Sequence, residues 1–389
     1  MKSELTLKEK ERRWSLVRQS MKEEGLTAIV SFGDEHYHVP TRYLTDYFAT
    51  GGSKQALFFP LEGDPVFLMA APRNKYFAEK IGWFPPENIR STNDWAGDLA
   101  RLVIEHRLHK KRIGLDSFRT WPVWDYRVFR GLCPDAELMD AGWLLMRVRG
   151  PKSAEELKLM GEATALAEGA QRTFLAHLKP GMKEEEVVAP VEAFIRAHGC
   201  HLRIWHVSST PEYPYPDIPG DIIIRRGNPV MFNSEFTRTC GYGVQVVRNY
   251  CWEEPRGLHK RIFELWGELR RLAEREFRTG AELTQVATKA EALADEWGFE
   301  CNYMGHAVGL VHAESPSISS DLGSERYIQR SHGKEWIMRT NEVFCFHPMV
   351  RPKGGGAPFV WMAEMYRVGE NGATWMTPFL PGLPEMIPG

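Results

Sequence analysis

The chain has 389 residues, enough for about two domains that each bury a hydrophobic core. With 43% hydrophobic residues, 26% charged residues and a formal net charge of −2, it has the composition of a globular protein and no strongly basic surface for nucleic acid. The sequence has no apolar run long enough to cross a bilayer and no signal-peptide pattern, so it predicts a cytoplasmic protein without membrane association. Its six cysteines are widely spaced, which predicts reduced thiols.

The first part of the chain alternates between helical and strand patterns. Residues 8–24 have the hydrophobic periodicity of a helix, and the apolar run 26–32 between two glycines predicts a buried strand. This alternation predicts an α/β domain over residues 1–148. Its other strands are predicted at residues 56–60 and 65–71, which form a hairpin, and at residues 112–116.

A turn at residues 149–152 ends this domain. Ser153 and Glu156 follow with the spacing of a capping box, in which each side chain accepts a hydrogen bond from a backbone amide at a helix start. We expect a long helix from there to about Leu178. The second domain is therefore predicted over residues 149–389.

The second domain contains a weak internal repeat. In each copy a glycine ends one helix, and the next helix runs to a terminal glycine. Chance similarity of helix ends is one interpretation, and a duplicated α/β half with a site on the pseudo-symmetry axis is the other. The matching positions are Gly181, Val187, Glu192, Ala193 and Gly199 in the first copy, and Gly280, Val286, Glu291, Ala292 and Gly298 in the second. Strands are predicted at residues 229–236, 241–252, 342–350 and 359–368.

Three motifs resemble those of the creatinase/prolidase/methionine-aminopeptidase family and together extend over nearly the whole chain. They lie at residues 41–46, 149–156 and 305–316, and the last is similar to the family signature G-H-G-I-G-L-x-x-H-E-x-P. The resemblance implies an α/β fold, with a creatinase-type N-terminal α/β domain followed by a duplicated α+β pita-bread domain. It also implies a homodimer in which the partner's N-terminal domain completes the site.

The resemblance further implies a pair of metal ions, held in the family's peptidases by two Asp, one His and two Glu. The histidine position falls on His306, but the second aspartate falls on Gln245. The two glutamates fall on His347 and Ala363. The first aspartate falls within residues 233–235, where spacing alone does not choose between Asn233, Ser234 and Glu235.

So few carboxylates predict that the dimetal site has been largely dismantled, because two divalent cations would lack ligands and negative charge. Glu364 follows Ala363, but a one-residue step along a strand points to the opposite face of the sheet. Creatinase and ectoine hydrolase are family members that act without metal, so the loss is compatible with catalysis.

The favoured hypothesis is a creatinase-like, metal-independent hydrolase or lyase without a cofactor, which cleaves a C–N or similar bond in a small polar, charged molecule. Peptidase activity is not expected. One alternative is a lyase or hydrolase with a single Fe, Mn or Zn ion held by His306, His347 and Glu235. Another is a protein that binds a small molecule without catalysis.

Four side chains form the predicted catalytic set: His306, His312, Glu235 and His347. For each histidine the competing interpretation is a core residue bonded to backbone carbonyls. An aromatic box for a cation competes with ordinary packing of the aromatic residues near position 213. Substrate-binding roles are predicted for Gln245, His206, Tyr213, Tyr215, Arg351, Trp361 and, from the partner subunit, Arg42.

Overall fold

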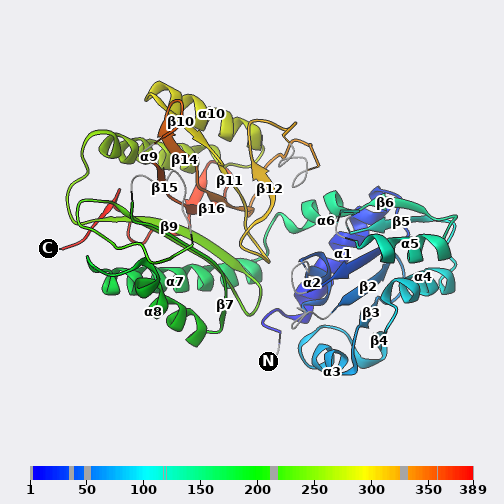
Figure 1. Cartoon of the computed structure of the whole chain (residues 1–389). Coiled ribbons are helices and arrows are strands. Elements are labelled where there is room, and N and C mark those ends of the chain that lie inside the picture. The colour runs from blue at the N-terminus through cyan, green and yellow to red at the C-terminus, as the bar shows by residue number, and fades with distance from the viewer. Residues whose placement is uncertain are drawn as a thin grey trace. The chain divides into compact units, whose positions relative to one another are not determined.

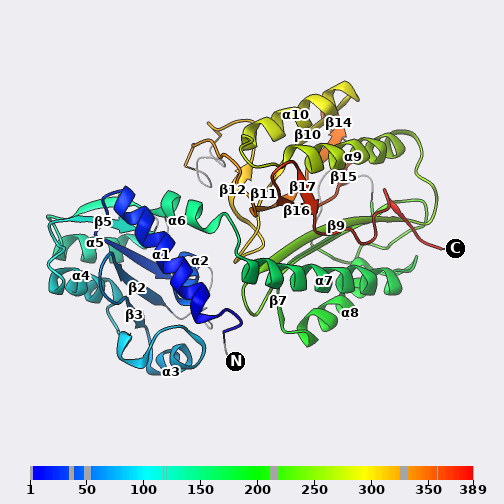
Figure 2. The same cartoon turned by 180° about the vertical axis from the view of Figure 1, so that it is seen from behind.

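The computed structural model describes residues 3–34, 39–47, 54–116, 118–119, 121–210, 218–324, 332–356 and 358–388. Its internal contacts divide the chain into two compact units, Met1–Arg149 and Gly150–Gly389, which Figure 1 and Figure 2 show from opposite sides. In the described part, none of the helices has the length and apolar character needed to span a membrane.

The first unit is a six-stranded mixed sheet in the order β4-β3-β2-β1-β5-β6. The predicted hairpin is present, because β2 and β3 pair antiparallel. The strands are β1 (Ala28–Gly33), β2 (Gln55–Pro60), β3 (Val66–Met69), β4 (Ile89–Ser91), β5 (Arg112–Leu115) and β6 (Glu137–Asp140). The helices are α1 (Leu7–Glu23), α2 (Val39–Thr45), α3 (Pro72–Ile81), α4 (Trp95–Glu105), α5 (Val123–Leu132) and α6 (Gly142–Arg149).

Alternate residues of the central strands face opposite sides of this sheet. Val30 and Phe58 pack with Leu99 of α4 and Phe129 of α5 in one apolar cluster. On the other face, Trp14 of α1 packs edge-on against the Phe59 ring, with ring centroids 5.7 Å apart. Strands buried on both faces explain why the apolar runs in the sequence are nearly continuous.

Arg42, which is predicted to reach a partner's site, lies in α2 and is buried within the first unit. Burial raises the pKa of Asp46 above its usual value, and the nearby Arg42 charge opposes this shift without cancelling it. The neighbouring Tyr43 is also buried, with the Arg13 guanidinium 4.5 Å from its ring centroid. The predicted role of Arg42 stays a prediction, and it requires the side chain to turn outward.

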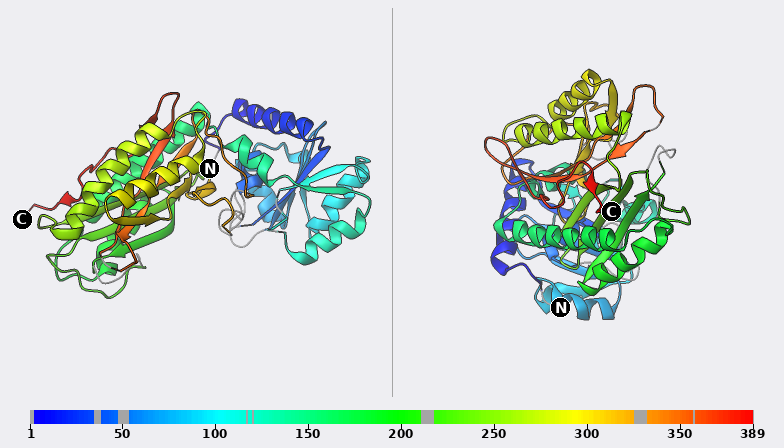
Figure 3. Two further views of the ribbon diagram at one scale, coloured as in Figure 1. Left: turned by 90° about the horizontal axis from the view of Figure 1, so that it is seen from above. Right: turned by 90° about the vertical axis from the view of Figure 1, so that its left-hand side faces the viewer.

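The second unit consists of two halves, each with a helix pair against strands, as the views of Figure 1, Figure 2 and Figure 3 show. The first half contains α7 (Ala154–His177), α8 (Glu184–Ala197), β7 (Cys200–Ser208), β8 (Val230–Arg238) and β9 (Gly243–Cys251). The second half contains α9 (Gly257–Glu276), α10 (Leu283–Glu296), β10 (Phe299–Asn302), β11 (Gly305–Ala307), β12 (Glu314–Ile318), β13 (Val343–Phe346), β14 (Met349–Pro352), β15 (Val360–Trp361), β16 (Glu364–Val368) and β17 (Ala373–Trp375). A last strand, β18 (Glu385–Met386), returns to pair with β9.

The internal repeat corresponds to these two halves. Gly181 and Gly280 each lie three residues before a helix, α8 and α10, and have φ angles of 90° and 83°. Gly199 and Gly298 each lie two residues after the same helices and have φ angles of 71° and 82°. The same left-handed backbone at the same offsets confirms the duplicated interpretation.

Candidate functional site

The geometry of β8 decides which residues of the segment 233–235 face the site. Ser234 points toward α7, because the Gln171 Nε2 of that helix donates to its Oγ at 2.9 Å. Asn233 and Glu235 therefore share the opposite face. Gln245 of β9 pairs directly with Glu235, so it lies on this face too.

Hydrogen bonds connect four side chains on this face. His312 Nε2 lies 3.1 Å from Glu235 Oε1, and the Asn233 amide nitrogen donates to Glu235 Oε2 at 3.2 Å. The same amide nitrogen lies 3.0 Å from His206 Nδ1. Because a carboxylate only accepts, His312 Nε2 carries a proton in this contact, which becomes an ion pair when the ring is doubly protonated.

His306 and His347 form a second group, in the other half of the unit. His306 Nδ1 lies 3.0 Å from the Ala307 carbonyl oxygen, so Nδ1 carries the proton and Nε2 is the basic nitrogen of the neutral ring. Its ring centroid is 5.0 Å from that of His347, which is fully buried just after β13. The His347 ring also packs against Tyr303 at 5.1 Å and Trp361 at 5.6 Å.

Trp361 and Cys345 connect the two groups. The Trp361 ring lies 5.8 Å from that of His206 as well as 5.6 Å from that of His347. Cys345 pairs with His306 across the strands, and its thiol donates to the Gln245 carbonyl oxygen at 3.8 Å. Burial and then the nearby Glu235 charge raise the Cys345 pKa well above its usual value, which keeps this thiol neutral. The structure thus brings His206, Glu235, Gln245, His306, His312, His347 and Trp361 into one region of the second unit.

These side chains do not fit a pair of divalent metal ions. The matched positions offer one carboxylate, from Glu235, and no carboxylate at Gln245, His347 or Ala363. Two ions need bridging carboxylates to share them. Across the described ranges, no group of three His, Cys, Asp or Glu side chains is arranged to hold a metal ion. A single ion at His306, His347 and Glu235 stays a prediction.

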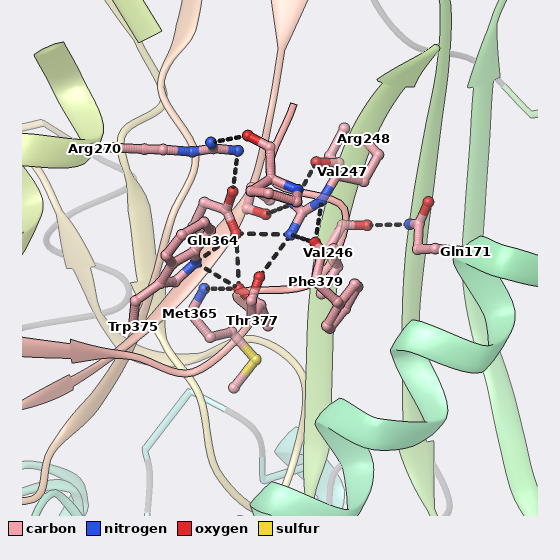
Figure 4. A network of polar contacts seen from close by, with 12 residues as sticks. Gln171, Val246, Val247, Arg248, Arg270, Glu364, Met365, Trp375, Thr377 and Phe379 are labelled. Carbon is pink, nitrogen blue, oxygen red and sulfur yellow. Dashed lines mark hydrogen bonds and ion pairs between the residues drawn. The ribbon is translucent and has the colours of Figure 1, made fainter. Parts of the chain in front are cut away.

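The carboxylate next to Ala363 belongs to a different network, shown in Figure 4. Glu364 is fully buried, with Oε2 3.0 Å from Arg248 Nη2 and Oε1 2.6 Å from Arg270 Nη2. Trp375 Nε1 and Thr377 Oγ1 also donate to Glu364 Oε2, at 2.9 and 2.7 Å. Strand alternation predicts this orientation away from the site, and the structure agrees.

Two further groups of predicted substrate residues remain. Arg351 is in strand β14, and its Nε lies 2.7 Å from Glu300 Oε1 of the neighbouring strand β10, while its substrate role stays a prediction. Tyr213 and Tyr215 fall outside the described residues.

Sequence reasoning missed Tyr303, which packs on His347. Its φ of 54° is unusual for a residue other than glycine and is the structural sign of a constrained position. In the sequence it lies between two short strands with no distinguishing pattern. Sequence reasoning also missed Asn233, whose side-chain nitrogen contacts both His206 and Glu235.

The chain matches the Creatinase/Prolidase N-terminal domain over residues 13–150 and metallopeptidase family M24 over residues 158–371. Similar proteins include the uncharacterized peptidase YqhT of Bacillus subtilis, 26% identical over 220 residues that cover 54% of this chain and 60% of the relative. The creatinase of Bacillus sp. (strain B-0618) is 21% identical over 414 aligned positions, which cover 97% of this chain and 93% of the creatinase. The solved structure of an X-Pro aminopeptidase from Thermotoga maritima has a TM-score of 0.77 at 19% identity and covers 96% of this chain and 98% of that one.

The chain spans 60–62% of the length of the first curated relatives it matches, YqhT and two Pyrococcus Xaa-Pro dipeptidases. The matched M24 segment alone extends over more than half of the chain, and the first unit accounts for the N-terminal match. The chain therefore belongs to metallopeptidase family M24, with a creatinase-type N-terminal domain followed by a pita-bread domain.

Proposed function

We propose that this protein is a hydrolase or lyase that cleaves a C–N or similar bond in a small, charged polar molecule and needs no metal ion. The observation that carries the proposal is the contact between His312 and Glu235, at 3.1 Å, on the face where the family's metal positions fall. At those positions Gln245, His347 and Ala363 replace carboxylates, which argues against the dimetal chemistry of the family's peptidases.

The two site histidines are suited to different parts of the reaction. With Nε2–H held by Glu235, the basic nitrogen of His312 is Nδ1. In a hydrolysis, Nδ1 takes a proton from the attacking water, whose oxygen bonds to the substrate carbon, and Glu235 stabilises the imidazolium. The C–N bond breaks with its electron pair on nitrogen, and the imidazolium returns the proton to that nitrogen. His306 Nε2 offers a second acceptor to the substrate.

Buried acceptors support a substrate that is rich in N–H donors. The Asn233 amide nitrogen faces Glu235, so its Oδ1 points away, and this atom has no hydrogen-bond partner within the described ranges. The same holds for Gln245 Oε1. A buried acceptor without a partner is costly, so amine or guanidinium N–H groups fit this face, with the Trp361 ring beside them.

The test uses purified protein dialysed exhaustively against a chelator, with its metal content measured by mass spectrometry. It is assayed on a panel of small guanidino compounds, ureas, amides and betaines, and separately on X-Pro dipeptides after loading with Mn²⁺ or Co²⁺. We expect C–N turnover that survives chelation and falls by ~10²-fold or more in Glu235→Gln and His312→Gln. His177→Gln, a change at an exposed histidine of α7, is the matched control and leaves turnover unchanged.

Several outcomes overturn the proposal. Turnover that returns only on metal addition rejects metal independence, and one tightly held ion per chain points to the mononuclear alternative. Hydrolysis of X-Pro dipeptides by the metal-loaded protein shows that it is a metal-dependent peptidase. A small molecule that binds tightly and is recovered unchanged indicates a binding protein.

A further inference from the structure

The start of helix α7 contacts two segments of the candidate site. Lys152 Nζ lies 3.3 Å from Glu314 Oε2, and the exposed fractions of these two side chains are only 3% and 4%. One turn further, Glu156 Oε1 accepts a hydrogen bond from the Tyr242 hydroxyl at 2.8 Å. The other oxygen of Glu156 caps the helix by accepting from the Ser153 amide at 2.8 Å.

Glu314 closes the loop that carries His312. Its Oε1 accepts the Leu310 backbone amide at 2.8 Å, while Oε2 faces Lys152. A Cβ at Gly309 would lie 2.5 Å from Glu314 Oε2, so the loop passes too close to the carboxylate for any side chain there. Within the loop 308–314, the Glu314 carboxylate therefore fixes the backbone at Gly309 and Leu310.

Strand β9 begins against the same loop. The Gly243 amide donates to the Gly309 carbonyl oxygen at 2.9 Å, and a Cβ at Gly243 would lie 2.5 Å from the His312 backbone nitrogen. Tyr242, which Glu156 holds, immediately precedes this contact. The helix start thus fixes both the loop with His312 and the strand with Gln245.

A buried ion pair gives little net stability, because the cost of desolvating both charges offsets their attraction. An apolar pair of similar volume often serves stability equally well. What the ion pair adds is a single orientation of the Glu314 carboxylate, with one oxygen on Lys152 and the other on the Leu310 amide.

We propose that Lys152 and Glu314 are positioning residues, which hold the loop 308–314 so that the His312 ring meets Glu235. The role in catalysis rests on the proposed function, since it matters to the reaction only if His312 transfers the proton. The geometric claim stands by itself.

The experiment compares the full-length protein with Lys152→Met, Glu314→Leu and the double variant. Hydrogen exchange is measured at the loop amides, the His312 ring is followed by ¹⁵N NMR, and melting temperature reports stability. Each single variant removes one member of this buried ion pair, and the double variant removes both, so the double variant carries the test if the single variants fail to fold. Lys289→Met, which breaks a 2.7 Å ion pair with Glu276 between α10 and α9, is the matched control.

We expect the double variant to melt close to the wild type, yet to lose protection at the Leu310 amide by about tenfold or more and to show shifted His312 ring signals. Lys152→Arg, which keeps the positive charge, should retain wild-type protection of the Leu310 amide and wild-type His312 ring signals. A double variant with unchanged exchange and an unchanged His312 signal overturns the proposal and leaves the pair a structural contact. Neither readout needs a substrate, so failure to find a reaction leaves this result intact.

Discussion

At the scale of single residues, two glutamates illustrate how position decides the role of a carboxylate. Glu235 lies on the face with the histidines and contacts His312. Glu364 lies on the opposite face of its strand, against two arginines. A step of one residue, from Ala363 to Glu364 at the start of β16, therefore separates the position that the resemblance matches to a metal ligand from a structural carboxylate.

Replacing Glu364 by alanine tests its structural role. Arg248 and Arg270 would remain buried without a carboxylate, so we expect the free energy of unfolding to fall by about 3–5 kcal/mol, measured by urea denaturation. Glu264→Ala, which removes a 4.0 Å contact with the exposed Lys260, should leave the free energy of unfolding unchanged within the error of the measurement. Equal, small effects of the two changes would show that the network in Figure 4 contributes little to folding.

At the scale of elements, the internal repeat rests on glycines that close equivalent turns. A Cβ at Gly181 or Gly280 would meet nothing within 4 Å, yet these residues have φ angles of 90° and 83°. The recurrence of glycine at these two positions is therefore explained by backbone conformation rather than by lack of space for a side chain.

Gly181→Ala and Gly280→Ala should each lower the free energy of unfolding by ~1–2 kcal/mol, since a left-handed alanine is strained. Gly161→Ala is the control: it lies inside α7, its Cβ also meets nothing, and its helical backbone should make alanine stabilising by ~0.5–1 kcal/mol. Calorimetry on the three variants compares them directly. A neutral effect at either turn would contradict the equivalence of the two halves.

At the scale of the whole molecule, the site residues described above all lie in the second unit, and the first unit has a separate core. We propose a homodimer, as the resemblance to the creatinase family implies. Sedimentation equilibrium at micromolar concentration should then give twice the chain mass of 44.6 kDa. A mass of one chain over that range rejects a dimer and with it any contribution of Arg42 to a partner's site.

From the sequence alone, the start of α7 at its capping box and the resemblance to the creatinase family could be predicted, and duplicated halves stood as one of two interpretations of the internal repeat. The same resemblance implies the loss of carboxylates at Gln245 and His347. These features depend on local patterns: helix caps, glycine turns and strand alternation act within a few residues. Alternation also predicts the outward face of Glu364.

The tertiary structure was needed to show that Ser234 faces α7 while Asn233 and Glu235 share the site face, that Glu235 contacts His312, and that Arg351 contacts Glu300. It also joined Lys152 to Glu314, which lies 162 residues further along the chain. Such contacts form between strands and loops that are far apart in the sequence. The spacing of residues along the chain does not predict which of these segments meet in the folded protein.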